Sequence, residues 1–469
     1  MAVTSERVLA LCKILKGVAP REELELADYL AAIPRLDSLA DLPAGTPVLV
    51  RGDLDAKPGP KLGDGDIRLR SMRETLAFGR AKGWKQILFG HRGRKEKDKA
   101  IGSLDKVAQR LGEVLACEVP LITDWLDEAT GQVKDHVKQK IAAAAPGSIF
   151  VLENVRAYDL ETVLWKAKEE ALPAIAAKLA QLANSLAEKV ADVYVNEALS
   201  AGSLDASSTI VPLAMRKVAL GKYLASEFES PMRECLQAKL VVFSGIKIDK
   251  LDDLEAMIER GTIGTIFSAG SLAMSLRKAA ARLDGQEFCL GVAEDPAHAD
   301  KAYYIPPDRI EQAERMLSAG RKLGIEFVLP IDSVLADGSV ADVLKPTDQQ
   351  FDVGPKTSAL FEQKVGEFIA AHKSNPAAAV AFHNGVFGMF EDPRFEAGTK
   401  AFVAQLKRLK DAGHKVYVGG GEGGTALEKY GQPTWVTHCF TAGGTVLNAL
   451  GSEPVPYLLA LREAAKKAS

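Results

Sequence analysis

Long apolar runs, paired cysteines and an excess of either charge are missing from this chain of 469 residues. Its five cysteines are scattered and show no CxxC spacing, which argues against a zinc site and a disulfide framework and fits a reducing compartment. No run approaches the roughly 18 apolar residues of a membrane span. A formal net charge of −3 gives no reason to expect nucleic acid or membrane binding. Together these absences favour a cytoplasmic protein.

What is present has the composition of a globular protein, with 47% hydrophobic and 26% charged residues. A chain of this length is too long for one ordinary hydrophobic core, so we expect two domains. The sequence contains no fixed-period repeat and no low-complexity tract.

Short apolar runs rich in β-branched residues alternate with segments of helical period throughout the chain. Examples are PVLVRGDLD, QILFGHRGR, SIFVLENVR and DVYVNEALSAG in the first half, and LVVFSGIK, TIFSAGS, AVAFHNGVFG and KVYVGGG in the second. Strands that are hydrophobic along their whole length and alternate with helices are typical of parallel sheets covered on both faces. We therefore predict an α/β protein with two Rossmann-like domains, each a parallel sheet flanked by helices.

Composition suggests where these domains begin and end. Residues 214–237 have helical composition without a strand signal and are predicted to form a helix that connects the two domains, while 161–190 are predicted as a surface-helix insert. The predicted divisions are a helical N-terminal extension (1–34), an N-terminal domain (35–213), the connector helix (214–237), a C-terminal domain (238–445) and a tail (446–469).

The predicted strand ends carry different residues in the two halves. In open parallel sheets, ligands bind beyond the carboxyl ends of the strands. In the first half these positions carry charged and polar side chains, namely Arg51, Asp53, Asp55, His91, Arg92, Arg94, Arg156 and Asn196. In the second half they carry glycine, in SGIK, SAGS, HNGVFG, GGGEGG and TAGG. Arginine forks suit a small carboxylate or phosphate, and glycine turns that open helices suit a polyphosphate. The contrast predicts phosphoryl transfer across a cleft between domains.

The turn GGGEGG at 419–424 places one carboxylate, Glu422, among five glycines. No Gly-Lys-Ser/Thr follows, so the turn is not a P-loop. An acid there would repel phosphates unless a divalent cation lay between them, and Mg²⁺ normally takes one or two carboxylates plus phosphate oxygens. Glu422 is therefore a candidate ligand of the Mg²⁺ of a Mg–nucleotide. The alternative is a flexible turn with a solvated glutamate.

The order of these stretches resembles the phosphoglycerate kinase family, from about residue 35 to the end. The matching stretches are RGDLDAK, IRLR, GHRGRK, LENVRA and VNEALS in the first half, and SGIKIDK, DVGPKT, HNGVFGMFE, GGGEGG and FTAGGT in the second. Each motif alone is weak, but ten of them occur in the same order as in the family. The resemblance implies two Rossmann-like domains, a reaction between ATP and 3-phosphoglycerate that gives ADP and 1,3-bisphosphoglycerate, and a tail that returns to the first domain.

The resemblance also implies site residues. The acceptor would contact Asp53, Asp55, Arg68, His91, Arg94 and Arg156. ATP or ADP would contact Gly245, Lys247, Asn384, Gly385, Glu391, Gly419, Gly420, Gly421, Glu422 and Gly423. The residues implied in catalysis are Arg68, Lys247 and Gly444, and Glu422 is the implied Mg²⁺ ligand. We expect a monomer that works by hinge-bending, with small-molecule substrates and no nucleic acid or membrane partner.

Departures from the family pattern lie at the ligand-facing positions. Asp55 replaces an asparagine, Leu204 an arginine, and Glu422 an aspartate; Ser203 and Ala206 replace histidines. Three readings follow: an unusual phosphoglycerate kinase, a kinase for another small carboxylate, or a non-catalytic nucleotide-binding or interaction protein. The extension and the 161–190 insert are candidate contact surfaces in the third.

Overall fold

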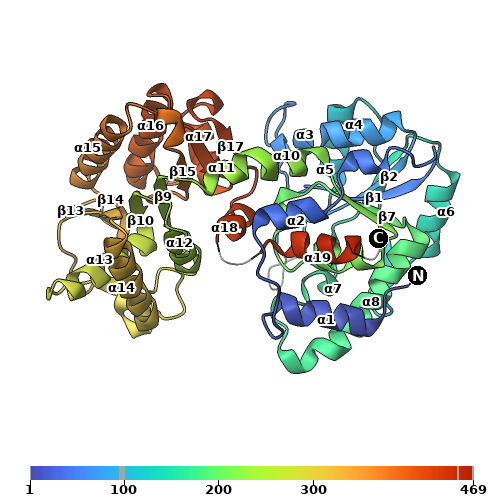
Figure 1. The fold of residues 1–469 in the computed structure, drawn as a ribbon, viewed down its shortest axis with the longest axis horizontal. Helices are drawn as coiled ribbons and strands as arrows, with labels where there is room; N and C mark the ends of the chain where they lie inside the picture. The colour runs from blue at the N-terminus through green and yellow to red at the C-terminus, as the bar shows by residue number, and fades with distance from the viewer. Residues whose placement is uncertain (1, 95–100, 452–453, 467–469) are drawn as a thin grey trace. The chain divides into compact units, whose positions relative to one another are not determined.

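The computed structural model describes residues 2–94, 101–451 and 454–466. The chain divides into two compact units, Met1–Glu229 with Pro454–Ser469, and Ser230–Glu453. Figure 1 labels the helices and strands of both units, and the chain begins and ends in the first. The predicted GHRGRK motif reaches Lys95, and this residue lies outside the described ranges.

A six-stranded sheet forms the centre of the first unit, and all of its strand pairs are parallel. Its order is β3 (Leu121–Ile122), β6 (Ile149–Leu152), β2 (Lys85–Phe89), β1 (Pro47–Arg51), β7 (Val193–Asn196) and β8 (Lys217–Leu220). Strands β4 (Leu126–Asp127) and β5 (Gln132–Val133) form a separate antiparallel pair. In the main sheet the chain runs from β1 outward to β2, then returns to the other side of β1 as β7. The point between β1 and β7 is therefore where the strand order reverses.

The helices of the first unit surround this sheet, and they include the two ends of the chain. They are α1 (Ser5–Leu15), α2 (Leu26–Ala32), α3 (Ile67–Ser71), α4 (Arg73–Ala81), α5 (Asp105–Leu115), α6 (Asp135–Ala143), α7 (Asp159–Thr162), α8 (Leu172–Lys189), α9 (Ala206–Thr209), α10 (Lys222–Glu227) and α19 (Pro456–Ala465). The N-terminal helix α1 packs on α8, and the C-terminal helix α19 packs on α2 and α9 (Figure 1).

The second unit repeats the plan with another parallel six-stranded sheet. Its order is β11 (Glu326–Val328), β10 (Thr265–Ala269), β9 (Leu240–Gly245), β15 (Ala381–Asn384), β16 (Val416–Gly419) and β17 (His438–Cys439). A small antiparallel sheet consists of β13 (Val340–Ala341), β12 (Ser333–Leu335) and β14 (Gln350–Val353). The helices are α11 (Arg233–Cys235), α12 (Lys250–Glu259), α13 (Gly270–Leu283), α14 (Pro307–Lys322), α15 (Pro355–Ala371), α16 (Ala397–Asp411), α17 (Glu422–Tyr430) and α18 (Gly444–Leu450).

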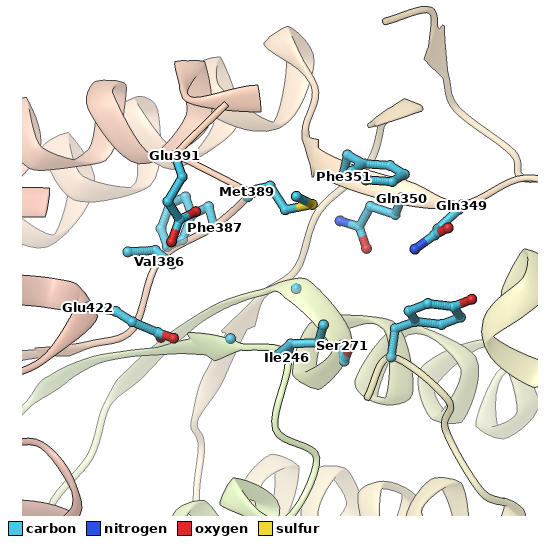
Figure 2. Close-up of a pocket in the computed structure, with 14 residues that line it drawn as sticks. Ile246, Ser271, Gln349, Gln350, Phe351, Val386, Phe387, Met389, Glu391 and Glu422 are labelled. Carbon is cyan, nitrogen blue, oxygen red and sulfur yellow. The ribbon is translucent and has the colours of Figure 1, made fainter. Parts of the chain in front are cut away.

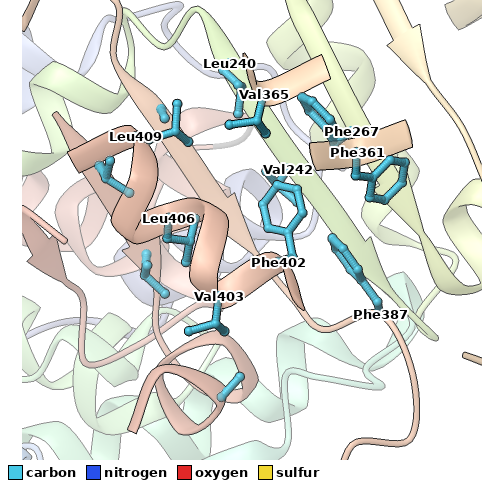
Figure 3. Packing of buried hydrophobic residues seen from close by; sticks show 14 of the residues in the cluster. Leu240, Val242, Phe267, Phe361, Val365, Phe387, Phe402, Val403, Leu406 and Leu409 are labelled. Carbon is cyan, nitrogen blue, oxygen red and sulfur yellow. The ribbon is translucent and has the colours of Figure 1, made fainter. Parts of the chain in front are cut away.

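Phenylalanine side chains fill the space between this second sheet and helices α15 and α16. Phe402 lies at the centre of the cluster, with ring centroids 4.9 Å from Phe387, 5.6 Å from Phe267 and 6.1 Å from Phe361 (Figure 3). The ring of His383, at the end of β15, stacks on Phe402 at 5.7 Å. Aromatic packing thus fixes the position of the end of β15, where the next loop begins.

The predicted class of fold, two parallel sheets flanked by helices, is confirmed. The prediction of a single helix over 214–237 is wrong, because Lys217–Leu220 forms β8 and pairs with β7. Only four residues, KVAL, make this strand, and the helical composition around them hid the signal. The remainder of the segment contains α10, a π-helical turn at Phe228–Met232 and α11. In the 161–190 stretch, α8 buries one face and is not only a surface helix.

None of the helices in the described part of the chain combines the length and the apolar character that crossing a membrane requires.

Glu197 follows β7 and is completely buried. Its carboxylate accepts hydrogen bonds from the backbone N–H groups of Tyr223 (3.0 Å) and Leu224 (3.1 Å) in the first turn of α10. Asn196 makes a comparable local bond, accepting from the N–H of Ala198 at 3.1 Å. These two residues therefore fix turns by bonding to the backbone. Burial raises the pKa of Glu197 from 4.5 to about 7, against the lowering effect of its hydrogen bonds.

We predict that the stability of Glu197→Gln relative to the parent protein rises as the pH rises from 5 to 8. A carboxyl whose pKa is raised on folding stabilises the folded state fully below its unfolded value, and this contribution is lost as the pH rises through the folded value. Glutamine has no such titration, and the difference amounts to roughly 3 kcal/mol. Thermal unfolding of both proteins at several pH values measures it. A difference that stays constant with pH would contradict the prediction.

Candidate active site

The charged residues of the first unit meet beyond the carboxyl ends of its strands, around the point where the strand order reverses. Arg51 is the last residue of β1, and Asp53 follows two residues later. Ser200, beyond β7, donates to Asp53 from its hydroxyl (2.7 Å). His91 lies just after β2, and Arg156 lies in the 3₁₀ turn Val155–Ala157 after β6. Arg51 and Arg156, 105 positions apart in the sequence, are thus brought to one edge of the sheet.

Arg68, from the short helix α3, lies between two carboxylates. Its Nη1 donates to the Asp55 carboxylate and to the Asp55 carbonyl, each at 2.8 Å, and its Nε lies 3.8 Å from Asp53. Burial raises the pKa of Asp53 despite the nearby guanidinium. Burial also acts to raise the pKa of Asp55, but the N–H of Gly93 (2.9 Å) and Arg68 outweigh it and leave that pKa lowered. Arg68 keeps about a fifth of its side chain exposed, so it can reach a ligand.

His91 is buried and uncharged. Its Nδ1 lies 2.9 Å from Nη2 of Arg51, which fixes Nδ1 as the acceptor because a guanidinium can only donate. Burial and then the charge of Arg51 lower the pKa of His91 well below 6.5. The imidazole is therefore neutral, with its Nε2 3.9 Å from Oδ2 of Asp55, and adds no positive charge to the site.

Arg156 is buried beside a carboxylate that sequence reasoning missed. Its Nη2 lies 3.0 Å from Oδ2 of Asp205, and its Nη1 donates to the carbonyl of Gly93 at 2.8 Å. Trp165 stacks on the guanidinium with its ring 4.8 Å away, and its indole N–H donates to Asp205 at 3.0 Å. The Nε of Arg156 has no hydrogen-bond partner among the described residues. Arg94, which follows Gly93 in the sequence, is exposed.

In the second unit, the strand order reverses between β9 and β15, and Gly245 and Asn384 end these two strands. Lys250, the first residue of α12, donates to the carbonyl of Ser244 and to Oδ1 of Asn384, each at 3.0 Å. Burial lowers the pKa of Lys250, and the charge of Glu422 opposes that shift. Lys247, the implied phosphate contact, is exposed in the turn before α12. The lysine that bonds to this strand end is the half-buried Lys250.

The glycines of this edge allow backbone to approach backbone closely. Gly385 has φ +100°, and a Cβ there would lie 2.1 Å from the carbonyl oxygen of Ser244. His383 supports the same turn, since its Nε2–H donates to the carbonyl of Gly385 at 2.8 Å. Burial lowers the pKa of His383 to about 4, so its ring is neutral.

The turn 419–423 runs from the end of β16 into α17. Gly419 ends the strand, Gly420 packs against the backbone of Phe440–Ala442, and Gly421 has φ +58°. Glu422 and Gly423 are the first two residues of α17. Gly444 is the first residue of α18, and a Cβ there would meet nothing within 4 Å among the described atoms. The predicted glycine positions therefore meet at one edge of the sheet.

A cavity of about 230 Å³ opens at this edge (Figure 2). Its lining includes the predicted residues Gly245, Glu391 and Glu422. Figure 2 shows both carboxylates at one end of the cavity and the aromatic ring of Phe351 at the other. The stretches SGIK, SAGS and HNGVFGMFE, which the sequence analysis had singled out, contribute Ile246, Gly270, Ser271, Val386, Phe387, Gly388 and Met389. The lining residues that sequence reasoning missed are Tyr303, Gln349, Gln350 and Phe351. Apolar walls with a few polar groups are typical of small-molecule sites, and sequence offers no signal for walls built from loops so far apart.

The Glu422 carboxylate could bind a Mg²⁺ ion that is also bound to the phosphates of a nucleotide. Across the described residues, no group of three or more His, Cys, Asp or Glu side chains could hold a metal ion by itself. Mg²⁺ bound with phosphates needs only one or two protein carboxylates, and the Glu422 carboxylate faces the cavity (Figure 2). Its Oε2 would lie 4.0 Å from a Cβ at Gly245, which places it at the strand end.

Two doubly wound sheets, with clustered arginines and carboxylates at the edge of one and a glycine-lined cavity at the edge of the other, are the arrangement expected of an α/β phosphotransferase. The model of the family described as phosphoglycerate kinase matches residues 39–453, and the chain belongs to this family. Related proteins include the cytosolic phosphoglycerate kinase of Triticum aestivum, 29% identical over 91% of this chain and 97% of the relative. A phosphoglycerate kinase of Bifidobacterium longum is 30% identical over 91% of this chain and 99% of the relative.

Solved structures show the same fold. The chain is similar to phosphoglycerate kinase from Pyrococcus horikoshii, with a TM-score of 0.70 and 24% identity over 93% of this chain and 100% of that one. The structure of phosphoglycerate kinase from Coxiella burnetii gives a TM-score of 0.63 and 24% identity over 92% of this chain and 99% of that one.

We predict that Gly385→Ala destabilises the second unit by about 1–3 kcal/mol, because the new methyl group meets the Ser244 carbonyl in a conformation that L-residues rarely adopt. Gly444→Ala is the matched control, since its methyl group meets open space, and its stability should stay within about 0.5 kcal/mol of the parent. Urea unfolding measures both. Equal midpoints for the two variants would contradict the account of Gly385.

Proposed function

We propose that the chain is an ATP-dependent kinase that transfers the γ-phosphoryl group reversibly to the carboxylate of an acceptor of the phosphoglycerate type. The observation that carries this proposal is the division of ligand chemistry between the two units. Arg68, partly exposed beside Asp53 and Asp55, offers a guanidinium to an anionic acceptor. The cavity at Gly245 and Glu422 offers glycine-lined backbone and a carboxylate to a Mg–nucleotide.

In this reaction an acceptor carboxylate oxygen forms a bond to the γ-phosphorus while the bond to the β–γ bridging oxygen of ATP breaks. The carboxylate is already ionised, so the step needs neither a general base nor a covalent enzyme intermediate. Catalysis then consists of positioning and of neutralising charge on the transferred group. Arg68 is proposed to orient the acceptor and to face the transferred phosphoryl.

The nucleotide is proposed to bind through the predicted residues of the second unit. Glu391 is proposed at the ribose, the turn 419–423 and the amide groups near Gly444 at the phosphates, and Lys247 beside them. Lys250 holds Asn384 in place at the strand end. Glu422 would hold Mg²⁺, which neutralises phosphate charge when bound.

The remaining proposals concern the protein as a whole. The two substrates would bind to different units, so transfer requires a domain movement that brings them together and excludes water. We place the protein in the cytoplasm as a monomer, without nucleic acid or membrane partners. A role in glycolysis follows where 3-phosphoglycerate is the acceptor.

We predict that Arg68→Ala lowers kcat/KM for ATP-dependent phosphorylation by about 10²–10³-fold, the usual effect of removing one donor that stabilises transition-state charge. The assay couples ADP release to a detectable reaction, with Mg–ATP and 3-phosphoglycerate and, in parallel, its unphosphorylated analogue glycerate. Arg70→Ala is the matched control, since Arg70 is in the same helix and pairs with Asp66 at 2.7 Å. Parent protein without turnover on either acceptor, or loss of activity in the control alone, would contradict the proposed function.

A further inference from the structure

Asp205 occupies the anion-binding side of Arg156. Its side chain is fully buried, and Arg156 Nη2 lies 3.0 Å from one of its oxygens and 3.4 Å from the other. The Trp165 indole donates to it at 3.0 Å, and Nη2 of Arg51 lies 3.6 Å away. Two guanidinium groups and an indole are the groups that would hold a bound carboxylate or phosphate. Here an internal carboxylate takes that place.

Asp55 has the same relation to Arg68. The carboxylate lies 2.8 Å from Nη1 of Arg68 and is further held by the N–H of Gly93. Three guanidinium groups (Arg51, Arg68 and Arg156) thus face three carboxylates (Asp53, Asp55 and Asp205). His91 contributes no charge, and Arg94 adds one further guanidinium to this environment. The cluster has little positive charge left for a ligand.

We infer that this site selects an acceptor whose negative charge is confined to the reacting carboxylate, and that Asp205 is the residue that excludes a second anionic group. The inference rests on the proposed phosphoryl transfer and specifies its substrate class as a small monocarboxylate, such as a hydroxy acid without a phosphate. A phosphate that bound to Nη2 of Arg156 would have to displace Asp205. That displacement would leave a buried carboxylate unpaired, which is strongly unfavourable.

The partners of the Arg156 side chain explain why Asp205, and not another residue, sets this preference. Nη1 is engaged by the carbonyl of Gly93, and Nη2 by Asp205. Removing the charge of Asp205 leaves the guanidinium stacked on Trp165 and makes its positive charge available. The free guanidinium would then attract the phosphate end of a phosphorylated acceptor.

The test compares 3-phosphoglycerate with glycerate in the full-length protein. Asp205→Asn removes the charge and keeps an oxygen that accepts from Trp165, and Asp205→Ala removes both. Asp192→Asn is the control, because Asp192 forms an exposed ion pair with Arg216. For each protein, kcat/KM is measured for both acceptors with Mg–ATP, and the Kd of each acceptor is measured by calorimetry without nucleotide.

We expect the parent to use glycerate at least as well as 3-phosphoglycerate. Asp205→Asn should lower the Kd for 3-phosphoglycerate roughly tenfold, the effect of one charge-assisted contact, and leave the Kd for glycerate unchanged. A parent that prefers 3-phosphoglycerate by roughly 100-fold or more in kcat/KM, or variants that weaken both acceptors equally, would overturn the inference. If neither acceptor supports ATP turnover, the proposed function is wrong, but the calorimetry still tests the role of Asp205. A higher affinity of Asp205→Asn for 3-phosphoglycerate supports that role, and an unchanged affinity overturns it.

Discussion

Buried pairing between guanidinium groups and carboxylates is the interaction on which the first unit depends. Arg51, Arg156 and Asp205 leave water together, and each charge is tolerated inside only because the others compensate it. Burial, and after it the charge of the surrounding arginines, lowers the pKa of His91 and keeps its ring neutral. The charge balance that allows this cluster to fold therefore also limits the charge of any ligand that the cluster can bind.

Sheet topology determines where this balance applies. Both sheets are parallel and reverse their strand order beside a central strand, so residues distant in sequence meet at one edge. In the second unit the edge is formed by close backbone contacts, with Gly385 against Ser244 and Gly420 against Phe440. Glycine leaves this edge free of side chains at the positions where the backbone turns, and we propose that a polyphosphate binds there. The proposed function assigns the acceptor to the charged edge of the first unit and the nucleotide to the glycine-lined edge of the second.

The sequence predicted the two parallel sheets because their strands are continuous apolar runs. Three of the residues that it proposed for the nucleotide, Gly245, Glu391 and Glu422, line the cavity of the second unit. It failed over 214–237, where the strand KVAL is too short to interrupt a helical composition. It also missed Asp205, Trp165 and Gln350, because their roles arise from contacts between segments far apart in the chain. Lys250 illustrates the same limit: the sequence analysis put forward Lys247, and only the hydrogen bond to Asn384 in the structure singles out Lys250.

The central claim is that internal carboxylates, and not the acceptor, neutralise the arginines of the first unit. A crystal structure with an ATP analogue, Mg²⁺ and a saturating concentration of 3-phosphoglycerate tests it most directly. The account predicts that Arg156 and Asp205 remain paired and that any acceptor bound in the first unit is held through its carboxylate by Arg68. A phosphate group seated on Arg156, with Asp205 turned away, would contradict it.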